Sequence, residues 1–361
     1  MTEKDPHTLS LEAKELLKSL IETPSFSREE DKTAALIAEF FQNKNIPFFQ
    51  KGNNIWVKNK KFDPQKPNIL LNSHHDTVKP NAGYTKDPFS CILEDGKIYG
   101  LGSNDAGGCL VSLIAAFYHF YGRDLPFNLI LAATAEEEIS GKNGIAYILP
   151  ELPEIELAIV GEPTLLQMAV AEKGLMVIDA EVTGKAGHAA RNEGENAIYK
   201  ALEDLNILKT FQFEKVSKFL GESKATVTII NSGSQHNVVP DKCTYCIDVR
   251  VTDAYTLEEA LAELESKLQA KLVPRSMRLN SSRIDENHPI LKAADELQLE
   301  KYGSPTLSDQ ALIPFPSVKI GPGDSARSHT ADEYIYDNEI KDGISLYIKL
   351  IETYAAMRST K

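Results

Sequence analysis

Three short runs of apolar residues constrain the fold of this 361-residue chain more than any other feature. They read NILLNS at residues 68–73, NLILAAT at 128–134 and ELAIVG at 156–161. Strands buried on both faces of a mostly parallel sheet have this composition, because neither face needs polar side chains. The stretch GGCLVSLIAAFYHF at 107–120 is long enough for a buried helix. We therefore expect an α/β domain with a mostly parallel sheet and helices on both faces.

The pattern changes after about Glu172 and changes back near residue 285. Between these points the signals follow the order strand, helix, two strands, helix, strand. The expected strands cover 175–184, 224–233, 242–251 and 276–283, and the expected helices cover 195–208 and 257–272. This order predicts that residues 173–285 form a small α+β domain with its helices on one face. It would be inserted into a large domain formed by residues 1–172 and 286–361.

A capping-box pattern precedes the helical sequence TAALIAEFF at residues 33–41. Ser27 and Glu30 have the spacing at which each side chain accepts a hydrogen bond from the main-chain N–H of the other residue. We therefore expect a helix that has Ser27 as its N-cap residue.

The charge and the cysteine content exclude several classes of protein. The chain carries a net charge of −13, which disfavours a nucleic-acid partner because phosphate binding needs clustered Lys and Arg. No apolar run approaches the roughly 20 residues that a membrane-spanning helix needs, and the first residues have no signal-peptide pattern. With four cysteines, a disulfide framework is not expected. We expect a cytoplasmic protein that binds neither nucleic acid nor membranes.

Histidines and acidic residues occur where the expected strands end. The first apolar run leads into HHD at 74–76, the second into EEE at 136–138 and the third into Glu162. Asp105 precedes the expected buried helix, and His329 follows a further strand-like segment. In an open α/β sheet, ligands bind outside the carboxyl ends of the strands. One such residue alone is more often structural, but their recurrence at strand ends favours a functional site.

These residue types suit a pair of divalent metal ions. Imidazole and carboxylate ligands without thiolates favour Zn²⁺, Co²⁺ or Mn²⁺ over a cysteine-bound structural zinc. Two ions about 3.5–4 Å apart need a bridging carboxylate and terminal ligands for each ion. The residues that could provide this set are His74, Asp105, Glu138, Glu162 and His329. A further carboxylate must stay unligated to accept a proton, and the adjacent Glu137 and Glu138 could divide the two roles.

Five motifs occur in the order in which a known family carries them. They are SHHDTV (73–78), YGLGSNDAGG (99–108), TAEEEISG (134–141), VGEPT (160–164) and HTADEYI (329–335). Over nearly its whole length the chain thus resembles the two-zinc aminoacylase and carboxypeptidase G superfamily. That family hydrolyses amide bonds next to a free carboxylate. The resemblance implies a hydrolase with two divalent metal ions, for which we expect zinc, with cobalt or manganese as alternatives.

The resemblance implies a role for each ligand residue. Asp105 would bridge the two metal ions. His74 and Glu162 would complete the ligands of one ion, and Glu138 and His329 those of the other.

The resemblance also assigns roles next to the metal ions. Glu137 would act as general base and then as general acid. In the pattern H-x-D, Asp76 would accept the second ring N–H of His74 and so orient the ring, whereas His75 has no chemical role. The peptide bond after Asp105 would be cis.

The small domain resembles the family's lid and dimerisation domain. The sequence TGKAGHAARNEGENAI at 183–198 matches the lid motif. His188 would therefore polarise the scissile carbonyl and stabilise the oxyanion, in its own site or in that of a partner subunit. The sequence HNVVPDKCTYCIDVR at 236–250 matches a substrate-binding segment, in which Asn237 and Arg250 would hold the substrate carboxylate. The resemblance thus implies a homodimer formed through this domain.

The sequence from 306 to 329, with its GPGD loop, is similar to the acetylornithine deacetylase branch of the family. This similarity implies removal of an N-acyl group, acetyl by default, from an ornithine-like or citrulline-like amino acid in arginine biosynthesis. Asp309 or Asp324 could attract an ornithine ammonium, and Arg327 could bind a succinyl carboxylate. The alternatives are a succinyl-amino-acid desuccinylase, a dipeptidase of the same family and a metal-free binding homologue.

Overall fold

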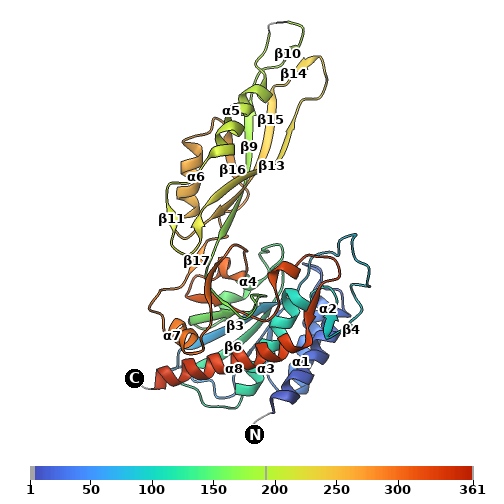
Figure 1. Cartoon of the computed structure of the whole chain (residues 1–361), viewed down its shortest axis with the longest axis vertical. Coiled ribbons are helices and arrows are strands. Elements are labelled where there is room, and N and C mark those ends of the chain that lie inside the picture. The colour runs from blue at the N-terminus through green and yellow to red at the C-terminus, as the bar shows by residue number, and fades with distance from the viewer. Residues whose placement is uncertain (1–4, 192, 360–361) are drawn as a thin grey trace. The chain divides into compact units, whose positions relative to one another are not determined.

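The computed structural model describes residues 5–191 and 193–359, and the chain divides into two compact units (Figure 1). The first unit consists of the residues up to Val170, Ile284–Tyr302 and the residues from Ser308 onward. The second consists of Ala171–Arg283 and Gly303–Leu307. None of the described helices is both long and apolar enough to cross a membrane.

The first unit is built on a sheet with strand order β1-β2-β6-β3-β7-β19-β8. The parallel strands are β6 (Asn128–Thr134), β3 (Asn68–His74), β7 (Ile155–Val160) and β19 (Ser317–Lys319). The antiparallel strands at the edges are β1 (Phe48–Lys51), β2 (Asn54–Lys58) and β8 (Met168–Glu172). The three apolar runs of the sequence thus form the centre of a mostly parallel sheet, as predicted.

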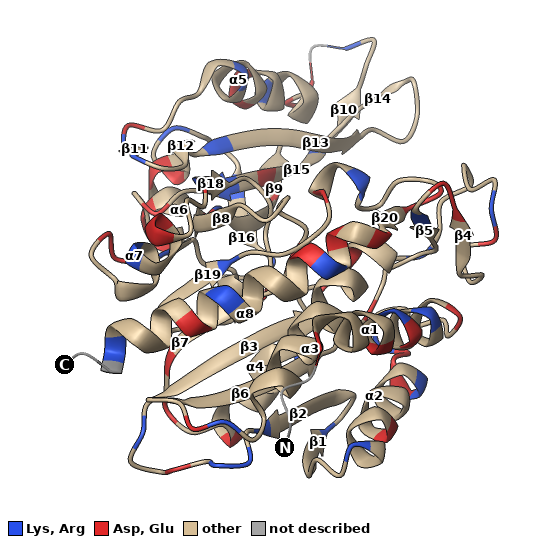
Figure 2. Ribbon diagram, turned by 60° about the horizontal axis from the view of Figure 1, so that its bottom comes forward, with Lys and Arg blue, Asp and Glu red and all other residues tan. Residues whose placement is uncertain are grey.

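Every residue of β3 and β6 is buried, and Figure 2 shows no charged residue along either strand. Strand side chains alternate between the two faces of a sheet, so each of these strands contributes to two layers. On one face, Leu70 and Ile130 pack with Ile145 and Ile148. The opposite face is covered by α3, which contacts β3 and β6 and packs against α1 and α8 (Figure 1). The α/β fold class with helices on both faces is confirmed.

The bounds of the helices and small strands complete the first unit. The helices are α1 (Pro6–Ile21), α2 (Asp31–Asn43), α3 (Gly108–Phe120), α4 (Ile145–Ile148), α7 (Pro289–Glu296) and α8 (Asp337–Ser359). A small antiparallel sheet contains β4 (Ile92–Glu94), β5 (Lys97–Tyr99) and β20 (Tyr334–Tyr336). The strand β18 (Lys301–Ser304) pairs with β8.

The expected capping box of Ser27 and Glu30 is wrong. Helix α2 begins at Asp31, and its N-cap residue, Glu30, makes no side-chain capping hydrogen bond. The fully buried Glu30 carboxylate instead accepts hydrogen bonds from the main-chain N–H of Glu136 and from the Asn53 side chain. The Ser27 hydroxyl donates to the carboxylate of Asp76 at 2.7 Å. Both side chains are therefore engaged by residues distant in sequence, and two of these follow the central strands β3 and β6.

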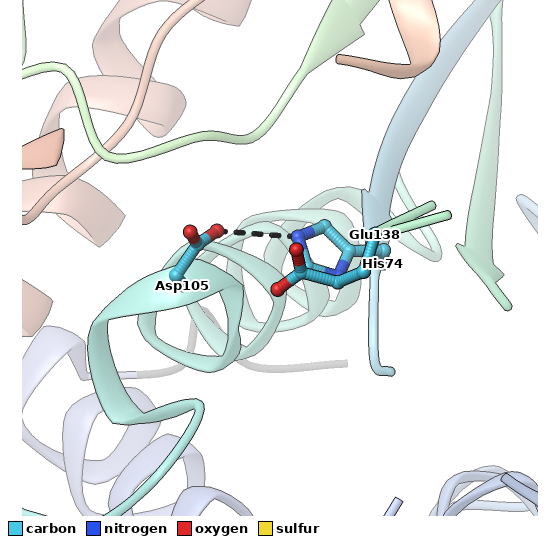
Figure 3. A group of neighbouring side chains, drawn as sticks. All are labelled: His74, Asp105 and Glu138. Atoms are coloured by element: carbon cyan, nitrogen blue, oxygen red, sulfur yellow. Dashed lines mark hydrogen bonds and ion pairs between the residues drawn. The ribbon is translucent and has the colours of Figure 1, made fainter. Parts of the chain in front are cut away.

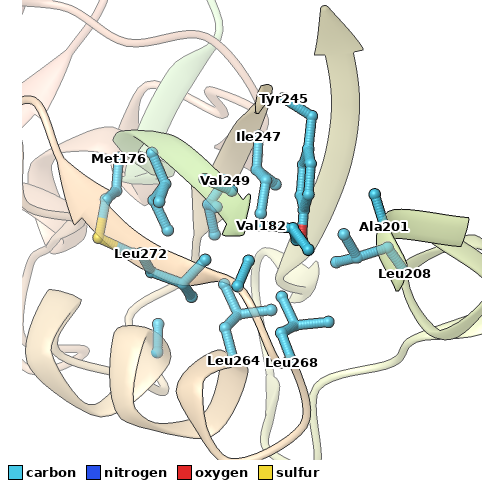
Figure 4. Packing of buried hydrophobic residues seen from close by; sticks show 14 of the residues in the cluster. Met176, Val182, Ala201, Leu208, Tyr245, Ile247, Val249, Leu264, Leu268 and Leu272 are labelled. Carbon is cyan, nitrogen blue, oxygen red and sulfur yellow. The ribbon is translucent and has the colours of Figure 1, made fainter. Parts of the chain in front are cut away.

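The second unit has an antiparallel sheet with strand order β13-β15-β9-β16. Its main elements are β9 (Gly174–Thr183), β13 (Lys224–Ser232), β15 (Lys242–Val251), β16 (Lys271–Pro274), α5 (Ala197–Thr210) and α6 (Leu257–Glu265). Two short ladders join β10 (Gly187–His188) to β14 (Val238–Val239) and β11 (Val216–Ser217) to β12 (Gly221–Glu222). Figure 4 shows Tyr245, Ile247 and Val249 of β15 across the core from Leu264 and Leu268. This is the small α+β arrangement predicted from the sequence.

The expected helix over 257–272 and the expected strand over 276–283 are wrong in part. Helix α6 ends at Glu265, and residues 271–274 form the edge strand β16, which pairs with β9. The buried Asp204 carboxylate on α5 accepts the main-chain N–H groups of Gln269 and Ala270, which holds these residues in a non-helical path. In the last segment only β17 (Ser282–Arg283) is a strand, and it pairs with β8.

Candidate metal centre

The end of β3 places His74 in a buried position with one ring nitrogen available to a ligand. His74 is the last residue of β3, and only 1% of its surface is exposed. Its Nδ1 lies 3.0 Å from the main-chain oxygen of Asp76. A carbonyl oxygen can only accept a hydrogen bond, so Nδ1 carries a proton and Nε2 is the nitrogen open to a metal ion. Nε2 faces a carboxylate oxygen of Asp105 at 3.3 Å.

Asp76 contacts more than the ring of His74. Its Oδ1 lies 3.4 Å from His74 Nδ1, farther than the main-chain oxygen of the same residue. Its carboxylate accepts the main-chain N–H groups of Glu137 at 3.0 Å and Glu138 at 3.2 Å. Burial alone would raise the pKa of Asp76, but hydrogen bonds from His74 and Ser27 hold that pKa below its usual value. A charged Asp76 therefore ties the end of β3 to the segment after β6.

Asp105 lies between two histidine rings. It belongs to the segment Ser103–Gly107 directly before α3, and its peptide bond to Ala106 is cis, as the family resemblance implies. Its Oδ1 faces Nε2 of His74 at 3.3 Å, and its Oδ2 faces Nε2 of His329 at 3.7 Å. A carboxylate that directs one oxygen toward each of two imidazoles has the arrangement needed to bridge two metal ions.

The three consecutive glutamates after β6 have three different surroundings. Glu138 Oε2 lies 2.9 Å from Nε2 of His329, and Glu137 Oε2 lies 3.8 Å from Nε2 of His74. Glu136 instead accepts hydrogen bonds from the main-chain N–H and the side-chain amide of Asn143. The backbone of Glu136 is left-handed, with φ of 55°, so the chain turns sharply between the strand and the next two glutamates.

The ends of three strands bring the expected ligands together. Glu162, which follows β7, has Oε1 3.8 Å from Nε2 of His74. The ligand atoms of His74, Asp105 and Glu138 lie within 4.8 Å of one another (Figure 3), as do those of His74, Glu137 and Glu162. Glu137 is as near to His74 as Glu162 is, so distance by itself assigns neither glutamate to the role of base.

The cluster concentrates negative charge in a buried place. Burial raises the pKa of Glu162 to about 8, and it raises the pKa of Glu137 well above its usual value. The charge of His74 opposes both shifts, whereas neighbouring carboxylates add to them. The hydrogen bond to Glu138 raises the pKa of His329 to about 9. Carboxylates crowded in this way are neutralised by divalent cations. The donor set, imidazole nitrogens and carboxylate oxygens, therefore fits a pair of metal ions.

Two residues near the cluster have contacts that the sequence patterns did not suggest. Ser27, expected to cap a helix, donates to Asp76. The buried Glu333 accepts a hydrogen bond from the main-chain N–H of Asp105 at 2.9 Å. The only sequence signal for Glu333 is its place in the motif HTADEYI, in which His329 alone had an expected role.

The residues considered for the substrate side chain already have protein partners. The Asp309 carboxylate is buried and accepts hydrogen bonds from Asn72 and Thr134. The Arg327 guanidinium makes two hydrogen bonds with the Glu339 carboxylate, at 2.7 and 2.9 Å. To bind a substrate side chain, either group would have to share or exchange these partners.

The expected lid residues belong to the second unit, whereas the cluster belongs to the first. His188 of β10 pairs with Val238 of β14, and Asn237 directly precedes β14; both His188 and Asn237 are exposed. The main-chain N–H of Ala189 donates to the main-chain oxygen of Asn237 at 3.0 Å. Arg250 lies on β15, and its guanidinium makes two hydrogen bonds with Asp248, at 2.8 and 3.0 Å. A substrate carboxylate that binds Arg250 would have to share the guanidinium with Asp248 or displace Asp248 from it.

Sequence comparisons relate the chain to one family of enzymes. The sequence pattern of "Peptidase family M20/M25/M40" matches residues 70–353. The chain is 27% identical to a protein named acetylornithine deacetylase from Proteus mirabilis, over 81% of each chain. It is also 27% identical to a protein of that name from Buchnera aphidicola, over 94% of this chain and 97% of the relative.

Solved structures share the fold at lower sequence identity. Aminopeptidase PepT from Bacillus cereus superposes with a TM-score of 0.77 at 17% identity, over 96% of this chain and 99% of that one. A structure from Bacillus subtilis, described as a dinuclear metal-binding peptidase from the M20 family, superposes with a TM-score of 0.73 at 16% identity, over 98% of this chain and 100% of that one.

Proposed function

Because the chain belongs to the peptidase family M20/M25/M40, we propose that it removes the acetyl group from an N-acetylated amino acid of the ornithine or citrulline type. The observation that carries this proposal is the carboxylate of Asp105, which faces the rings of both His74 and His329. The similarity to acetylornithine deacetylases over most of the chain supports the choice of substrate. The reaction would then belong to arginine biosynthesis, in the cytoplasm.

Five residues of the cluster would hold the two metal ions. Asp105 would lie between them, with His74 and Glu162 on one side and Glu138 and His329 on the other. Bound divalent ions would supply electrophilic polarisation of the acyl carbonyl and a lower pKa for the attacking water. Zinc fits these ligands well, and cobalt and manganese accept the same nitrogen and oxygen donors.

Glu137 is proposed as the group that moves the proton. Its carboxylate lies at the cluster, and its main-chain N–H is held by Asp76. Burial raises its pKa well above the usual value, which brings it closer to the pH at which a base and an acid are both needed. Glu137 would take a proton from water as the oxygen bonds to the acyl carbon. It would then give that proton to the amine nitrogen as the carbon–nitrogen bond breaks, releasing acetate and the free amino acid.

The second unit would complete the site as a lid and as the dimer interface. His188 would donate to the developing oxyanion, in its own site or in that of the partner subunit of a homodimer. Asn237 and Arg250 would bind the carboxylate of the substrate, with the guanidinium exchanging Asp248 for this ligand.

The substrate class can be tested directly with the purified protein. We expect that zinc-loaded protein hydrolyses N-acetylornithine or N-acetylcitrulline with a higher kcat/KM than N-succinylornithine or a dipeptide. A preference for N-succinylornithine would favour a desuccinylase, and a preference for the dipeptide would favour a dipeptidase. Hydrolysis of none of the four compounds by metal-loaded protein would favour a non-catalytic binding protein.

A further inference from the structure

A buried carboxylate outside the expected ligand set holds the segment that carries Asp105. Glu333 lies just before β20 and is 1% exposed. Its Oε1 accepts the main-chain N–H groups of Asn104 and Asp105, both at 2.9 Å, and its Oε2 accepts that of Gly102 at 3.2 Å. Its main-chain oxygen accepts the N–H of Gly100 at 3.0 Å. Glu333 thus accepts one hydrogen bond from each of four residues in the segment 100–105.

The main chain of the segment accepts the N–H groups of Ser103 and Gly107, whereas those of Gly102, Asn104 and Asp105 are accepted by Glu333. Gly102 has a left-handed backbone with φ of 76°, and Asp105 has φ of −116° and ψ of 98°, so the chain is not helical before α3. The N–H groups of Gly102, Asn104 and Asp105 point at the Glu333 carboxylate, and not at main-chain carbonyl groups as in a helix. Leaving a buried N–H without a partner is costly, so these three bonds fix the path of the segment.

The same side chain connects two groups of expected ligands. Glu333 is four residues after His329, and its carboxylate binds the main chain of Asp105 directly. The distance between Asp105 Oδ2 and His329 Nε2, 3.7 Å, therefore depends on this link. Asn104 adds a second link, because its side chain accepts the N–H of Asp324 and donates to the carbonyl oxygen of that residue, both at 3.0 Å.

We propose that Glu333 is a positioning residue that fixes the carboxylate of Asp105 between the two metal positions. This inference rests on the metal centre of the proposed function. Replacing one of the two acceptor oxygens of Glu333 should therefore weaken metal binding without changing any proposed ligand atom.

The neighbouring Asp332 offers a matched control. Its carboxylate also accepts main-chain N–H groups, but those of Thr85 and Lys86, and it bonds the Thr85 hydroxyl. The variants Glu333→Gln and Asp332→Asn each replace one carboxylate by an amide of the same shape, in adjacent residues of the same segment. Glu333→Gln removes support from the segment that contains Asp105, whereas Asp332→Asn removes support from Thr85 and Lys86.

The test measures zinc affinity by competition with a chelator of known affinity, on chelator-stripped full-length protein, and it measures the Tm of the metal-free form. We expect Glu333→Gln to weaken binding of at least one zinc ion about 10–100-fold, the range found when residues that support ligands are replaced. Asp332→Asn should keep wild-type affinity. If Glu333→Gln does not fold, Glu333→Asp carries the same test, because it keeps a carboxyl group but draws it back from the segment.

The outcomes separate this inference from the proposed function. Wild-type zinc affinity in a folded Glu333 variant would overturn the positioning role, and so would an equal loss in Asp332→Asn. Absence of zinc binding by the wild-type protein would overturn the metal centre and, with it, the positioning role. Weakened zinc binding in the variant, with no hydrolysis of the acetylated substrates by the wild type, would uphold the role of Glu333 and overturn only the substrate assignment.

Discussion

The carboxylate of Asp76 accepts the main-chain N–H of Glu137 at 3.0 Å, which joins the segment that orients His74 to the segment that carries the proposed base. The next residue, Glu138, donates its N–H to the other oxygen of the same carboxylate at 3.2 Å. Asp76 therefore contacts both parts of the proposed site: its main-chain oxygen bonds the ring of His74, and its carboxylate holds the two glutamates after β6. Its effect on catalysis should be larger than the orientation of one imidazole would explain.

Replacing Asp76 by Asn should lower both metal affinity and kcat. An amide has one acceptor oxygen in place of two, so one of the N–H groups of Glu137 and Glu138 loses its partner. We expect a loss of about 10–100-fold in zinc affinity, measured by chelator competition, together with a reduced kcat at saturating zinc. Ser27→Ala is the control, because it removes a single hydrogen bond to Asp76 and leaves both oxygens of the carboxylate in place. A smaller effect in Asp76→Asn than in Ser27→Ala would contradict this role.

The adjacent histidines should respond differently to replacement. His74→Ala removes the ring whose Nε2 faces Asp105, so metal analysis should find one of the two ions lost or weakly held. His75 has Nδ1 2.9 Å from the Thr33 hydroxyl and Nε2 2.9 Å from the carbonyl oxygen of Asn53, and burial lowers its pKa to about 4.

His75→Ala should therefore act on stability and keep both metal ions. It leaves the hydroxyl of Thr33 and the carbonyl of Asn53 without this partner, which should cost about 1–3 kcal/mol in the free energy of unfolding. Denaturant unfolding and metal analysis of the two variants give the measurements. Equal loss of metal from both variants would contradict the assignment of His74 as a ligand and His75 as a structural residue.

Glu137→Ala should remove catalysis and leave metal binding intact. General base and acid catalysis contributes typically 10²–10⁴-fold, so kcat should fall by about that factor while zinc content stays at the wild-type level. Glu136→Gln is the control within the same three glutamates, because Glu136 bonds Asn143 and no group of the cluster. Its kcat should stay close to that of the wild type. Near wild-type turnover by Glu137→Ala with metal bound would show that another group moves the proton.

His188→Ala should lower kcat without changing metal affinity, because His188 lies in the second unit and the cluster in the first. If His188 acts in the site of a partner subunit, inactive His188→Ala and inactive Glu137→Ala proteins should regain activity when they are mixed and allowed to exchange subunits. A mixed dimer would then contain one site with both groups. Unchanged inactivity of the mixture, with exchange verified by mass spectrometry, would place His188 in its own site.

The core of the fold and the clustering of histidine and carboxylate side chains could be predicted because local sequence patterns indicate both. Apolar runs such as 68–73 and 128–134 can be satisfied only by burial on two faces, and parallel strands place their carboxyl ends on one side of a sheet. Since His74, Glu138 and Glu162 follow such strands closely, their convergence follows from the strands themselves. The patterns failed where a local signal competed with a distant partner. Asp204, for example, draws Gln269 and Ala270 out of an expected helix.

The sequence by itself determined the α/β architecture, the inserted α+β unit and the kind of ligands that gather at the strand ends. Only the tertiary structure decided how these ligands are supported. Ser27 bonds Asp76 across 49 residues of sequence, and Glu333 bonds the main chain of Asp105 across 228. It also decided that Glu136 faces Asn143 whereas Glu137 and Glu138 face the histidines. Such contacts depend on strand order and on packing between segments far apart in the chain, and periodicity within any one segment does not encode them.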